Sequence, residues 1–344
     1  MARNFNERLM TVSAQPKATL DTIGAVIIGR NEGQRLVRCL NSVRNHVESV
    51  VYVDSGSSDG STDTAKSLGA TVLALDLREP FTAARARNAG LQFFLQSHPS
   101  IDHIFFIDGD CEVHDSWIDI ARSFLVSHPD VAVVWGRRRE RFPERSIYNM
   151  LCDIEWASSP IGETKACGGD AVIRVAVLKE VNGYRDDLIC GEEPELCVRI
   201  RQKGWRIWRL DEEMTIHDAA MYRFDQWWRR NMRSGYGFAL GASVHGAPPE
   251  RHWVKESRRI WIFGLGVPVA TICASFIFGL PALLLLGIYP LQLVRLAHFE
   301  GRFSRTQWIW AAAMVMGKFP MMLGQVRFVI DRVRRVNSRL IEYK

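Results

Sequence analysis

The sequence has few cysteines and no pair of them in metal-binding spacing. Seven cysteines are scattered over 344 residues, and none forms a C-x-x-C pair. An odd, scattered set argues against a disulfide framework and against a structural zinc site. Residues 1–20 also lack an apolar run of signal-peptide type. We therefore expect a flexible N-terminal leader over residues 1–20, and a folded part that stays in the reducing cytoplasm.

Short apolar runs alternate with helical patterns in the first part of the chain. The expected strands are residues 23–28, 50–53, 71–75, 104–107 and 131–135, and the expected helices are residues 33–43, 62–68, 83–96 and 117–126. Strands that are apolar throughout and alternate with helices are typical of a mostly parallel sheet covered on both faces. The sequence therefore predicts an α/β, Rossmann-like domain over residues 21–248.

No charged residue occurs between Trp261 and Val294. A single helix of that length would measure roughly 51 Å, whereas the hydrocarbon core of a bilayer is about 30 Å thick. We therefore expect a hairpin of two short helices over residues 261–294, turning near Gly279. Basic residues flank both ends, so the positive-inside rule places both ends in the cytoplasm. A buried helical core is the alternative interpretation.

A second apolar segment, residues 307–330, is interrupted by Lys318, Pro320 and Arg327. This pattern favours an interfacial helix, and the basic tail that follows is expected to face anionic lipid. Residues 249–344 are thus predicted to form a membrane-associated region. The net charge is +6, and basic residues lie on either side of the apolar segments. This distribution indicates a membrane partner and no nucleic acid.

Two carboxylates separated by a glycine follow the expected strand at residues 104–107. Asp108 and Asp110 therefore lie at the carboxyl end of a strand, where open α/β sheets bind their ligands. Such a pair can hold a hard divalent cation, which neutralises a diphosphate. A D-x-D triplet alone is equally typical of a solvated turn.

Two further strand ends carry small and acidic side chains. Asn31 and Glu32 follow the first strand, and D-S-G-S-S-D-G-S at residues 54–61 follows the second. An acidic side chain after the second strand, such as Asp54, can accept hydrogen bonds from a ribose or a base. The first loop lacks the glycine-rich phosphate loop with a lysine that a nucleotidyltransferase would need. The three strand ends together favour a nucleotide site.

These motifs resemble those of membrane-associated bacterial family 2 glycosyltransferases of the GT-A fold. The resemblance covers about residues 22–204 and includes, in the family's order, N-E at 31–32, D-S-G-S-S-D-G-S at 54–61, R-A-R-N-A-G at 85–90, D-G-D at 108–110, G-G-D at 168–170 with Arg174, and G-E-E-P-E-L at 191–196. It implies a metal-dependent, inverting hexosyltransferase that uses Mn²⁺ or Mg²⁺. It also implies a nucleotide-sugar donor, with a UDP-sugar favoured over a GDP-sugar.

The resemblance implies roles for individual residues as well. The nucleotide side would be contacted by Asp54, with Asn31, Glu32 and Ser57 beside it. Asp108 and Asp110 would serve the diphosphate and the metal, Asp110 in preference as the direct ligand. Arg85 and Arg87 would contact phosphate, with a solvated helix face as the alternative. His217 could complete the metal shell with an imidazole nitrogen, or be a structural hydrogen-bonding residue.

The G-E-E-P-E-L motif supplies the candidate general base. In the family, the second acidic residue of this motif removes the proton from the acceptor hydroxyl, which implies that role for Glu193, with Glu192 beside it. A carboxylate suits the task because burial can raise its pKa. Glutamate stands here in place of the usual aspartate, so Glu192 and Glu195 stay open as alternatives. Capping of a helix at residues 195–203 is the other interpretation.

Residues 226–230, Q-W-W-R-R, are similar to the Q-x-x-R-W signature of processive polysaccharide synthases, but Arg230 replaces the final tryptophan. We expect Gln226 and Arg229 to line the acceptor site or to hold the diphosphate. An amphipathic helix on the membrane face is the alternative.

The resemblance and the membrane region together predict a lipid-linked acceptor, used in the synthesis of an exported polysaccharide or glycolipid. Attachment to the membrane would raise the effective concentration of such an acceptor. The expected location is the cell inner membrane, with the catalytic domain on the cytoplasmic side. The alternatives are a processive polysaccharide synthase, for which one hairpin offers too few helices to line a pore, and a non-catalytic membrane-bound scaffold that binds nucleotide-sugars.

Overall fold

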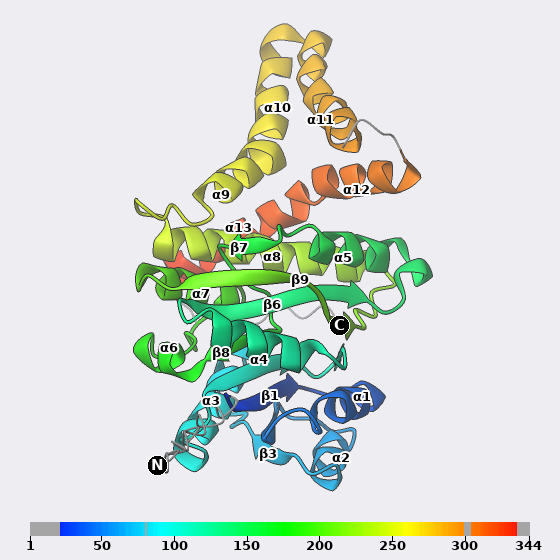
Figure 1. The fold of residues 1–344 in the computed structure, drawn as a ribbon. Coiled ribbons are helices and arrows are strands. Elements are labelled where there is room, and N and C mark those ends of the chain that lie inside the picture. Colours follow the sequence, from blue (N-terminus) through cyan, green and yellow to red (C-terminus); the bar gives the residue numbers. More distant parts are fainter. Residues whose placement is uncertain (1–20, 80, 299–303, 336–344) are drawn as a thin grey trace, which may run out of the picture.

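The structure, a computed structural model, describes residues 21–79, 81–298 and 304–335 (Figure 1). The expected leader, residues 1–20, lies outside the described residues, as does the basic tail beyond residue 335. A domain built on one sheet, called the catalytic domain after the expectation above, forms most of the molecule, and a helical hairpin projects from it (Figure 1).

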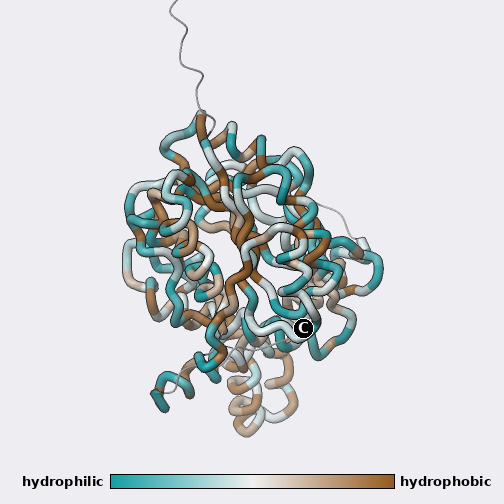
Figure 2. Tube along the Cα trace, turned by 90° about the horizontal axis from the view of Figure 1, so that it is seen from below, coloured by the Kyte–Doolittle hydropathy of each residue, from teal (hydrophilic) through white to brown (hydrophobic). Residues whose placement is uncertain are grey.

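The sheet has nine strands in the order β3-β2-β1-β4-β8-β6-β9-β5, with β7 paired to β9. The strands are β1 (Ile23–Gly29), β2 (Ser49–Asp54), β3 (Thr71–Ala74), β4 (His103–Asp108), β5 (Cys111–Val113), β6 (Val131–Glu140), β7 (Gly162–Thr164), β8 (Ala171–Arg174) and β9 (Arg206–His217). Apolar residues run along the central strands (Figure 2), as the continuous apolar runs of the sequence predict.

The parallel part of the sheet comprises β3, β2, β1 and β4, which confirms the expected architecture for the N-terminal half. The other half is mixed. Strand β8 runs antiparallel to both β4 and β6, whereas β6 and β9 are parallel to each other. Because β8 runs opposite to β4, its first residues lie beside the carboxyl end of β4. This reversal brings the G-G-D motif to the edge that carries D-G-D.

Helices cover both faces of the sheet (Figure 1). They are α1 (Gln34–Val43), α2 (Ser61–Ser67), α3 (Ala83–Ser97), α4 (Trp117–Ser127), α5 (Ile147–Ala157), α6 (Val175–Glu180), α7 (Glu192–Gln202) and α8 (Phe224–His245), with a short 3₁₀ turn at Pro143–Arg145. Helix α3 lies very close to β1: a Cβ atom on Gly90 would be 2.3 Å from the side chain of Val26. Glycine at this position therefore permits the approach that sets Arg87 near the end of β4.

The C-terminal region consists of helices only, within the residues that the structure describes. They are α9 (Val254–Trp261), a π-helical turn (Ile262–Gly266), α10 (Val267–Phe278), a 3₁₀ segment (Leu280–Gly287), α11 (Ile288–Ala297), α12 (Arg305–Met316) and α13 (Lys318–Arg334). Three stretches, Val254–Phe278, Leu280–Ala297 and Arg305–Arg334, are long and apolar enough to cross a membrane, judged by length and composition. The first two form the projecting hairpin and meet at Gly279, within the segment where the sequence predicts the turn.

Helix α13 is attached to the catalytic domain and differs in this from the hairpin. It crosses α8 where Gly235 and Gly324 allow the two backbones to approach, because a Cβ atom at either position would be about 2.0 Å from the other helix's backbone. The buried Gln325 also accepts a hydrogen bond of 3.1 Å from the Ser257 hydroxyl on α9. In the hairpin, by contrast, large apolar side chains such as Phe276 and Leu284 are more than 80% exposed.

Candidate active site

A cleft with two adjoining compartments lies at the carboxyl ends of β1 and β4. The D-G-D compartment, of about 570 Å³, is lined by the loops after these strands, together with His217. The E-E compartment, of about 710 Å³, is lined by Gly168–Asp170, Glu192 and Glu193. Asp108 lines both compartments, as do Ala83, Arg138, Trp156, Arg230 and Arg233. The Asp108 carboxylate thus lies between a candidate metal site in one compartment and a candidate general base in the other.

Sheet register brings the motifs of the first compartment together. In the parallel ladders Gly29 pairs with Asp54 and Ile28 with Asp108, so the three strand ends share one edge. In the antiparallel ladder Cys111 pairs with His217. The predicted neighbours Asp110 and His217 therefore meet, with 3.2 Å between Asp110 Oδ1 and His217 Nε2.

Four residues could offer ligand atoms to one metal ion: Asp108, Asp110, Cys111 and His217, whose candidate atoms all lie within 4.8 Å of one another. Carboxylate oxygens and an imidazole nitrogen suit Mn²⁺, and the carboxylates suit Mg²⁺. Burial raises the pKa of the Cys111 thiol well above its usual value, so this soft ligand stays protonated and is a poor candidate. Asp108, Asp110 and His217 fit the predicted ion.

Arg87 connects the two compartments through its guanidinium, which is only 2% exposed. It lies 3.0 Å from Asp108 Oδ1, 3.0 Å from Glu192 Oε1 and 2.9 Å from Glu193 Oε1. In this structure Arg87 therefore binds carboxylates, and its contact with a phosphate stays a prediction. The buried guanidinium is already engaged by three carboxylates, and a phosphate would have to displace them.

Removing the Arg87 charge is expected to destabilise the catalytic domain. Arg87→Met would leave three buried or half-buried carboxylates without their shared cation, and breaking a buried ion pair in this way costs about 3–5 kcal/mol. Urea denaturation of the full chain in detergent measures the loss of unfolding free energy. Arg78→Met is the control, because Arg78 pairs with Asp76 on the surface and its loss should change stability little. A loss below about 1 kcal/mol for Arg87→Met would contradict the assigned role.

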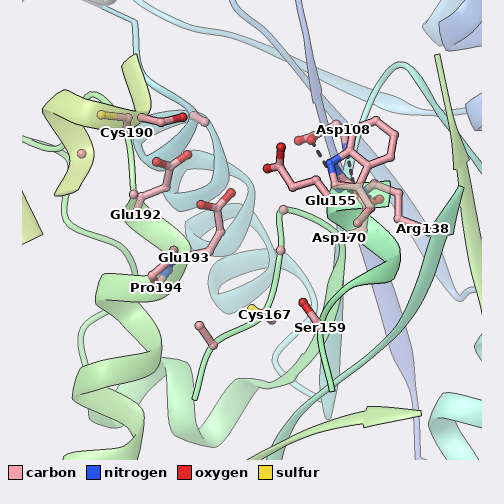
Figure 3. A pocket seen from close by; sticks show the side chains of 18 of the residues that line it. Asp108, Arg138, Glu155, Ser159, Cys167, Asp170, Cys190, Glu192, Glu193 and Pro194 are labelled. Carbon is pink, nitrogen blue, oxygen red and sulfur yellow. Dashed lines mark hydrogen bonds and ion pairs between the residues drawn. The ribbon is translucent and has the colours of Figure 1, made fainter. Parts of the chain in front are cut away.

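Glu193 lies at the start of α7, which begins three residues earlier than the sequence pattern predicts. Gly191 adopts a left-handed conformation with φ of 78° just before the helix and so directs the two glutamates into the cleft. Figure 3 shows Glu192 and Glu193 on one side of the cavity and Asp108, Asp170 and Arg138 on the other.

Burial, reinforced by the negative charge of Glu192, raises the pKa of Glu193 to about 7, although Arg87 opposes the rise. A carboxylate with a pKa near neutrality is suited to accept a proton at neutral pH.

The other two glutamates of the motif are held by cations. Glu195 is buried, lies 2.8 Å from Arg199 and 2.9 Å from His245, and lines neither compartment among the described residues. Glu195 therefore links α7 to α8 and is no longer a candidate base. Glu192 lines the E-E compartment but is almost fully buried against Arg87.

The loops after β1 and β2 are tied to each other. The Asn31 side-chain oxygen accepts a hydrogen bond of 2.8 Å from the Ser58 N–H, and the Asn31 N–H donates one of 2.9 Å to the Ser57 hydroxyl. The buried Asp54 carboxylate accepts from the N–H groups of Gly56 and Ser57 at 2.9 Å each. Asp54 thus shapes the loop and lies outside the compartment lining, whereas Asn31, Glu32 and Ser55 line it.

Three further predicted contacts are not supported by the geometry. Arg85 lies 3.4 Å from Glu79 and donates a bond of 2.8 Å to the carbonyl of Asp76, outside the lining of the cleft. Gln226 accepts bonds of 2.9 and 3.0 Å from the N–H groups of Tyr222 and Arg223 and so caps the start of α8. Arg229 is exposed on the same helix. Arg230 and Arg233 line the cleft in its place, which helical phase explains.

Sequence reasoning assigned no role to two polar residues of the cleft, Asp170 and Arg138. Asp170, fully buried, accepts hydrogen bonds from the Asp108 N–H at 3.2 Å and from the Thr215 hydroxyl at 2.8 Å, and lies 2.7 Å from Arg138. The Arg138 guanidinium also lies 5.5 Å from the centre of the Trp156 ring. The G-G-D motif did signal Asp170. Arg138 was missed because β6 continues beyond the apolar run from which the strand was predicted.

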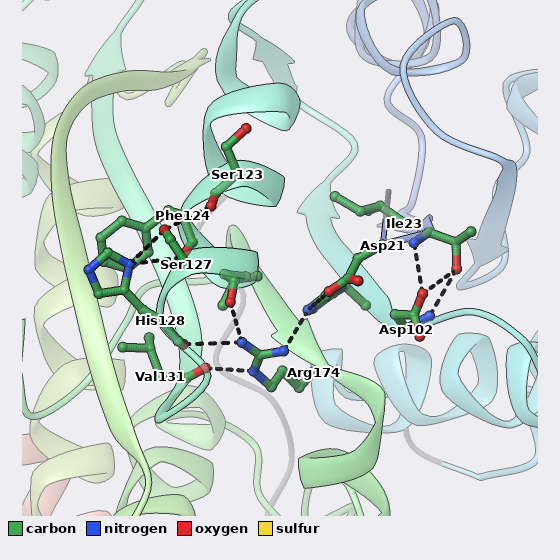
Figure 4. Close-up of polar contacts among 12 residues, drawn as sticks. Asp21, Ile23, Asp102, Ser123, Phe124, Ser127, His128, Val131 and Arg174 are labelled. Carbon is green, nitrogen blue, oxygen red and sulfur yellow. Dashed lines mark hydrogen bonds and ion pairs between the residues drawn. The ribbon is translucent and has the colours of Figure 1, made fainter. Parts of the chain in front are cut away.

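Arg174, part of the same motif, is structural. Its guanidinium donates hydrogen bonds to the carbonyls of Val131, Leu125 and His128, at 2.7, 2.5 and 3.1 Å (Figure 4). These bonds tie β8 to the end of α4 and the start of β6, outside the lining of the cleft.

The fold and the cleft define a class of protein. A sheet that presents an acidic triplet and a histidine at its carboxyl edge, opposite a glutamate pair on a helix, is typical of transferases that act on nucleotide-sugars. Residues 25–182 match the family model described as Glycosyl transferase family 2. The match covers a little under half of the chain, and together with the cleft it supports a family 2 glycosyltransferase.

Relatives of known name agree with this assignment. The chain is 24% identical over 232 residues to Glycosyltransferase AglE of Haloferax volcanii, a match covering 64% of this chain and 74% of AglE. It is 26% identical over 176 residues to Succinoglycan biosynthesis protein ExoA of Rhizobium meliloti, a match covering 49% of this chain and only 53% of ExoA.

A solved structure shares the fold over most of the chain. It is the mannosyltransferase PcManGT from Pyrobaculum calidifontis, in complex with GDP-Man and Mn²⁺, with a TM-score of 0.62 and 18% identity. The similarity covers 92% of this chain and 89% of PcManGT, so it extends beyond the catalytic domain into the C-terminal helices.

Proposed function

We propose that the protein is a metal-dependent, inverting hexosyltransferase that moves a sugar from a nucleotide-sugar to a lipid-linked acceptor. The observation that carries the proposal is the pairing of Asp110 with His217 in one compartment and the position of Glu193 in the next, with Asp108 between them. Donor and acceptor would occupy the D-G-D and E-E compartments, respectively.

On the donor side, Asp110, His217 and Asp108 would hold the ion, and Asn31 and Glu32 would face the nucleoside. Bound Mn²⁺ or Mg²⁺ would neutralise charge that develops on the diphosphate leaving group. The fold is shared with a mannosyltransferase whose structure contains GDP-Man and Mn²⁺, which supports this use of the acidic triplet. The base of the nucleotide, uracil or guanine, is an outcome of the binding measurement described in the Discussion.

On the acceptor side, Glu193 would remove the proton of an acceptor hydroxyl while that oxygen attacks the anomeric carbon. The C–O bond to the new acceptor forms as the bond to the nucleotide diphosphate breaks, and the proton passes to the Glu193 carboxylate. A single displacement of this kind inverts the configuration at the anomeric carbon. Arg87, held between Glu193 and Asp108, keeps the two sides of the reaction in register.

The lipid-linked acceptor follows from the position of the membrane region. Trp253, which immediately precedes α9, lines the E-E compartment, and the uncharged run begins at Ile260 on the same helix. A lipid-anchored substrate at the base of the hairpin would thus be within a few residues of the acceptor side. The location that this favours is the inner membrane, with the catalytic domain in the cytoplasm. Similarity to a succinoglycan biosynthesis protein supports a role in making an exported polysaccharide.

Because residues of α8 line the proposed substrate site, two adjacent arginines of this helix are expected to differ in their effect on catalysis. Arg230 lines both compartments and lies 2.7 Å from Glu155, whereas Arg229 is exposed. A charged hydrogen bond to substrate is worth about 1.5–3 kcal/mol, so Arg230→Ala is expected to lower kcat/KM roughly tenfold to a hundredfold. Arg229→Ala is the matched control and should change it less than about twofold. Equal losses in the two variants would contradict the assignment.

The proposed function as a whole is tested by incubating the full chain, in membranes, with labelled nucleotide-sugars and extracted lipid. The expected product is a lipid carrying one added sugar whose anomeric configuration, read by NMR, is opposite to that of the donor. Retention of configuration would contradict the single displacement.

A further inference from the structure

The tip of the hairpin carries no polar side chain. Residues 276–287, all within the described part of the chain, read F-I-F-G-L-P-A-L-L-L-L-G. Phe276, Leu280 and Leu284 are 87%, 80% and 81% exposed. Turns that reach water are usually rich in asparagine, aspartate and serine, and an exposed apolar surface of this size marks a contact with another apolar phase.

Both backbone polar groups of Gly279 are hydrogen-bonded within the turn. Chain segments in hydrocarbon must satisfy their own N–H and C=O groups. The Gly279 N–H donates to the Ser275 carbonyl at 3.0 Å, and the Gly279 carbonyl accepts from the Ala282 N–H at 3.1 Å. Pro281 has no N–H to satisfy. Gly279, with φ of 65°, is the single residue between the two helical arms.

The hydroxyl groups of the hairpin also donate hydrogen bonds to backbone carbonyls of the hairpin. Thr271 donates to the Val267 carbonyl at 2.9 Å and Ser275 to the Thr271 carbonyl at 2.8 Å. The Tyr289 hydroxyl donates to the carbonyl of Phe263 on the other arm at 2.6 Å. These bonds remove much of the cost of placing polar groups in hydrocarbon.

The lengths of the arms agree with a tip that stays inside the bilayer. The first uncharged arm, residues 260–278, is about 28 Å long at 1.5 Å per residue. The second, residues 280–294, is about 26 Å long when its 3₁₀ part is counted at 2.0 Å per residue. A hydrocarbon core is about 30 Å thick, so neither arm reaches beyond it. The nearest charged residues, Arg259 and Arg295, both lie at the base.

We propose that the hairpin is re-entrant: it enters a phospholipid bilayer from one face, reverses in the hydrocarbon at Gly279 and returns to the same face. This inference rests on the membrane attachment proposed above and adds to it that no residue of the hairpin reaches the opposite aqueous side. The protein is then exposed to water on one face of the membrane only, takes its acceptor from that face and does not itself carry the product across.

The proposal is tested by thiol labelling of the full chain. Leu280→Cys is introduced together with Cys273→Ala, which removes the exposed native thiol. A membrane-impermeant sulfonated maleimide is added to spheroplasts and, separately, to inside-out vesicles. The thiol at the tip is expected to stay unlabelled in both and to react only after denaturation in SDS. Lys255→Cys in the same background is the control at the base, and should be labelled in inside-out vesicles alone.

Two results would overturn the inference, and they can be told apart. Labelling of Leu280→Cys in spheroplasts, with Lys255→Cys labelled only in inside-out vesicles, would mean that the hairpin crosses the membrane; the attachment itself would stand. Failure of either variant to sediment with membranes after a salt wash would refute both the attachment and the re-entrant hairpin.

A second pair of variants tests the same inference without chemical labelling. Phe278→Lys places a charge at the tip, where burial in hydrocarbon is expected to lower the membrane-bound share roughly tenfold or more. Val254→Lys, at the exposed start of α9 beside Lys255, should leave it unchanged. A tip that emerges into water would tolerate Phe278→Lys as well as Val254→Lys.

Discussion

Replacing Glu193 by glutamine is expected to lower kcat on the order of 10²- to 10⁴-fold, the range that a general base contributes, and to leave the donor Kd unchanged. The amide keeps nearly the same shape but cannot accept the proton of the acceptor hydroxyl. Single-turnover sugar transfer measures the rate, and calorimetric titration of the donor measures its binding.

The control for this experiment is Glu180→Gln. Glu180 is a half-exposed carboxylate at the end of α6, paired with Lys203, and its change should leave the rate within about twofold. Glu192→Gln separates the two adjacent glutamates. If Glu192→Gln is the slower variant, or if donor binding falls as far as kcat in Glu193→Gln, the base has been assigned to the wrong residue.

The same assignment predicts a pH dependence. The pKa of Glu193 is raised to about 7 by burial first, then by Glu192. The charged and titratable groups that face it are Arg87 from α3, Glu192 from α7, Asp108 from β4, Cys167 before the G-G-D loop, Tyr184, and Cys190 before α7. Only the deprotonated carboxylate can act as the base, so kcat should rise with pH up to about 7 and level off above it. Glu193→Gln should lose this dependence.

Replacing Asp110 by alanine is expected to abolish metal-dependent donor binding and to lower sugar transfer on the order of a thousandfold. Asp110 is buried, and its carboxylate lies 3.2 Å from His217 Nε2 in the lining of the D-G-D compartment. Alanine removes the most enclosed carboxylate of the proposed metal site and leaves Asp108 and His217 without it. The readouts are Mn²⁺ titration and the transfer rate.

Asp63→Ala is the control, since Asp63 is an exposed carboxylate on α2. It removes the same charge from the surface and should change neither readout. Turnover in Asp110→Ala within a few fold of that in Asp63→Ala would mean that the acidic triplet is not the metal centre.

The strands and helices that position the site could be predicted because their apolar runs are continuous. Strands β1, β2 and β4 lie within a residue or two of the predicted ranges, and their ends carry Asn31, Asp54 and Asp108 as predicted. The mixed half of the sheet could not be predicted. Strands β5, β7 and β8 are three or four residues long, too short to show a period, and their direction depends on pairing with distant strands.

The directions in which individual side chains point could not be predicted from the sequence either. A motif can place Arg85 and Arg87 on one helix, but packing of Gly90 against Val26 decides that Arg87 faces three carboxylates. In α8, the phase that turns Arg230 rather than Arg229 into the cleft is set by contact with α13 across Gly235 and Gly324. These contacts join residues that are more than sixty positions apart in the chain, so no local sequence pattern predicts them.

The most direct test of the central claim is a thermal-shift screen of the full chain in detergent against UDP- and GDP-sugars, with Mn²⁺ and with EDTA. A ligand that binds only the folded protein raises its Tm. One nucleotide class is expected to raise the Tm in the presence of Mn²⁺, EDTA to remove the shift, and Asp110→Ala never to show it. An equal shift in EDTA, or in Asp110→Ala, would contradict a metal-dependent donor site at Asp108-Gly109-Asp110.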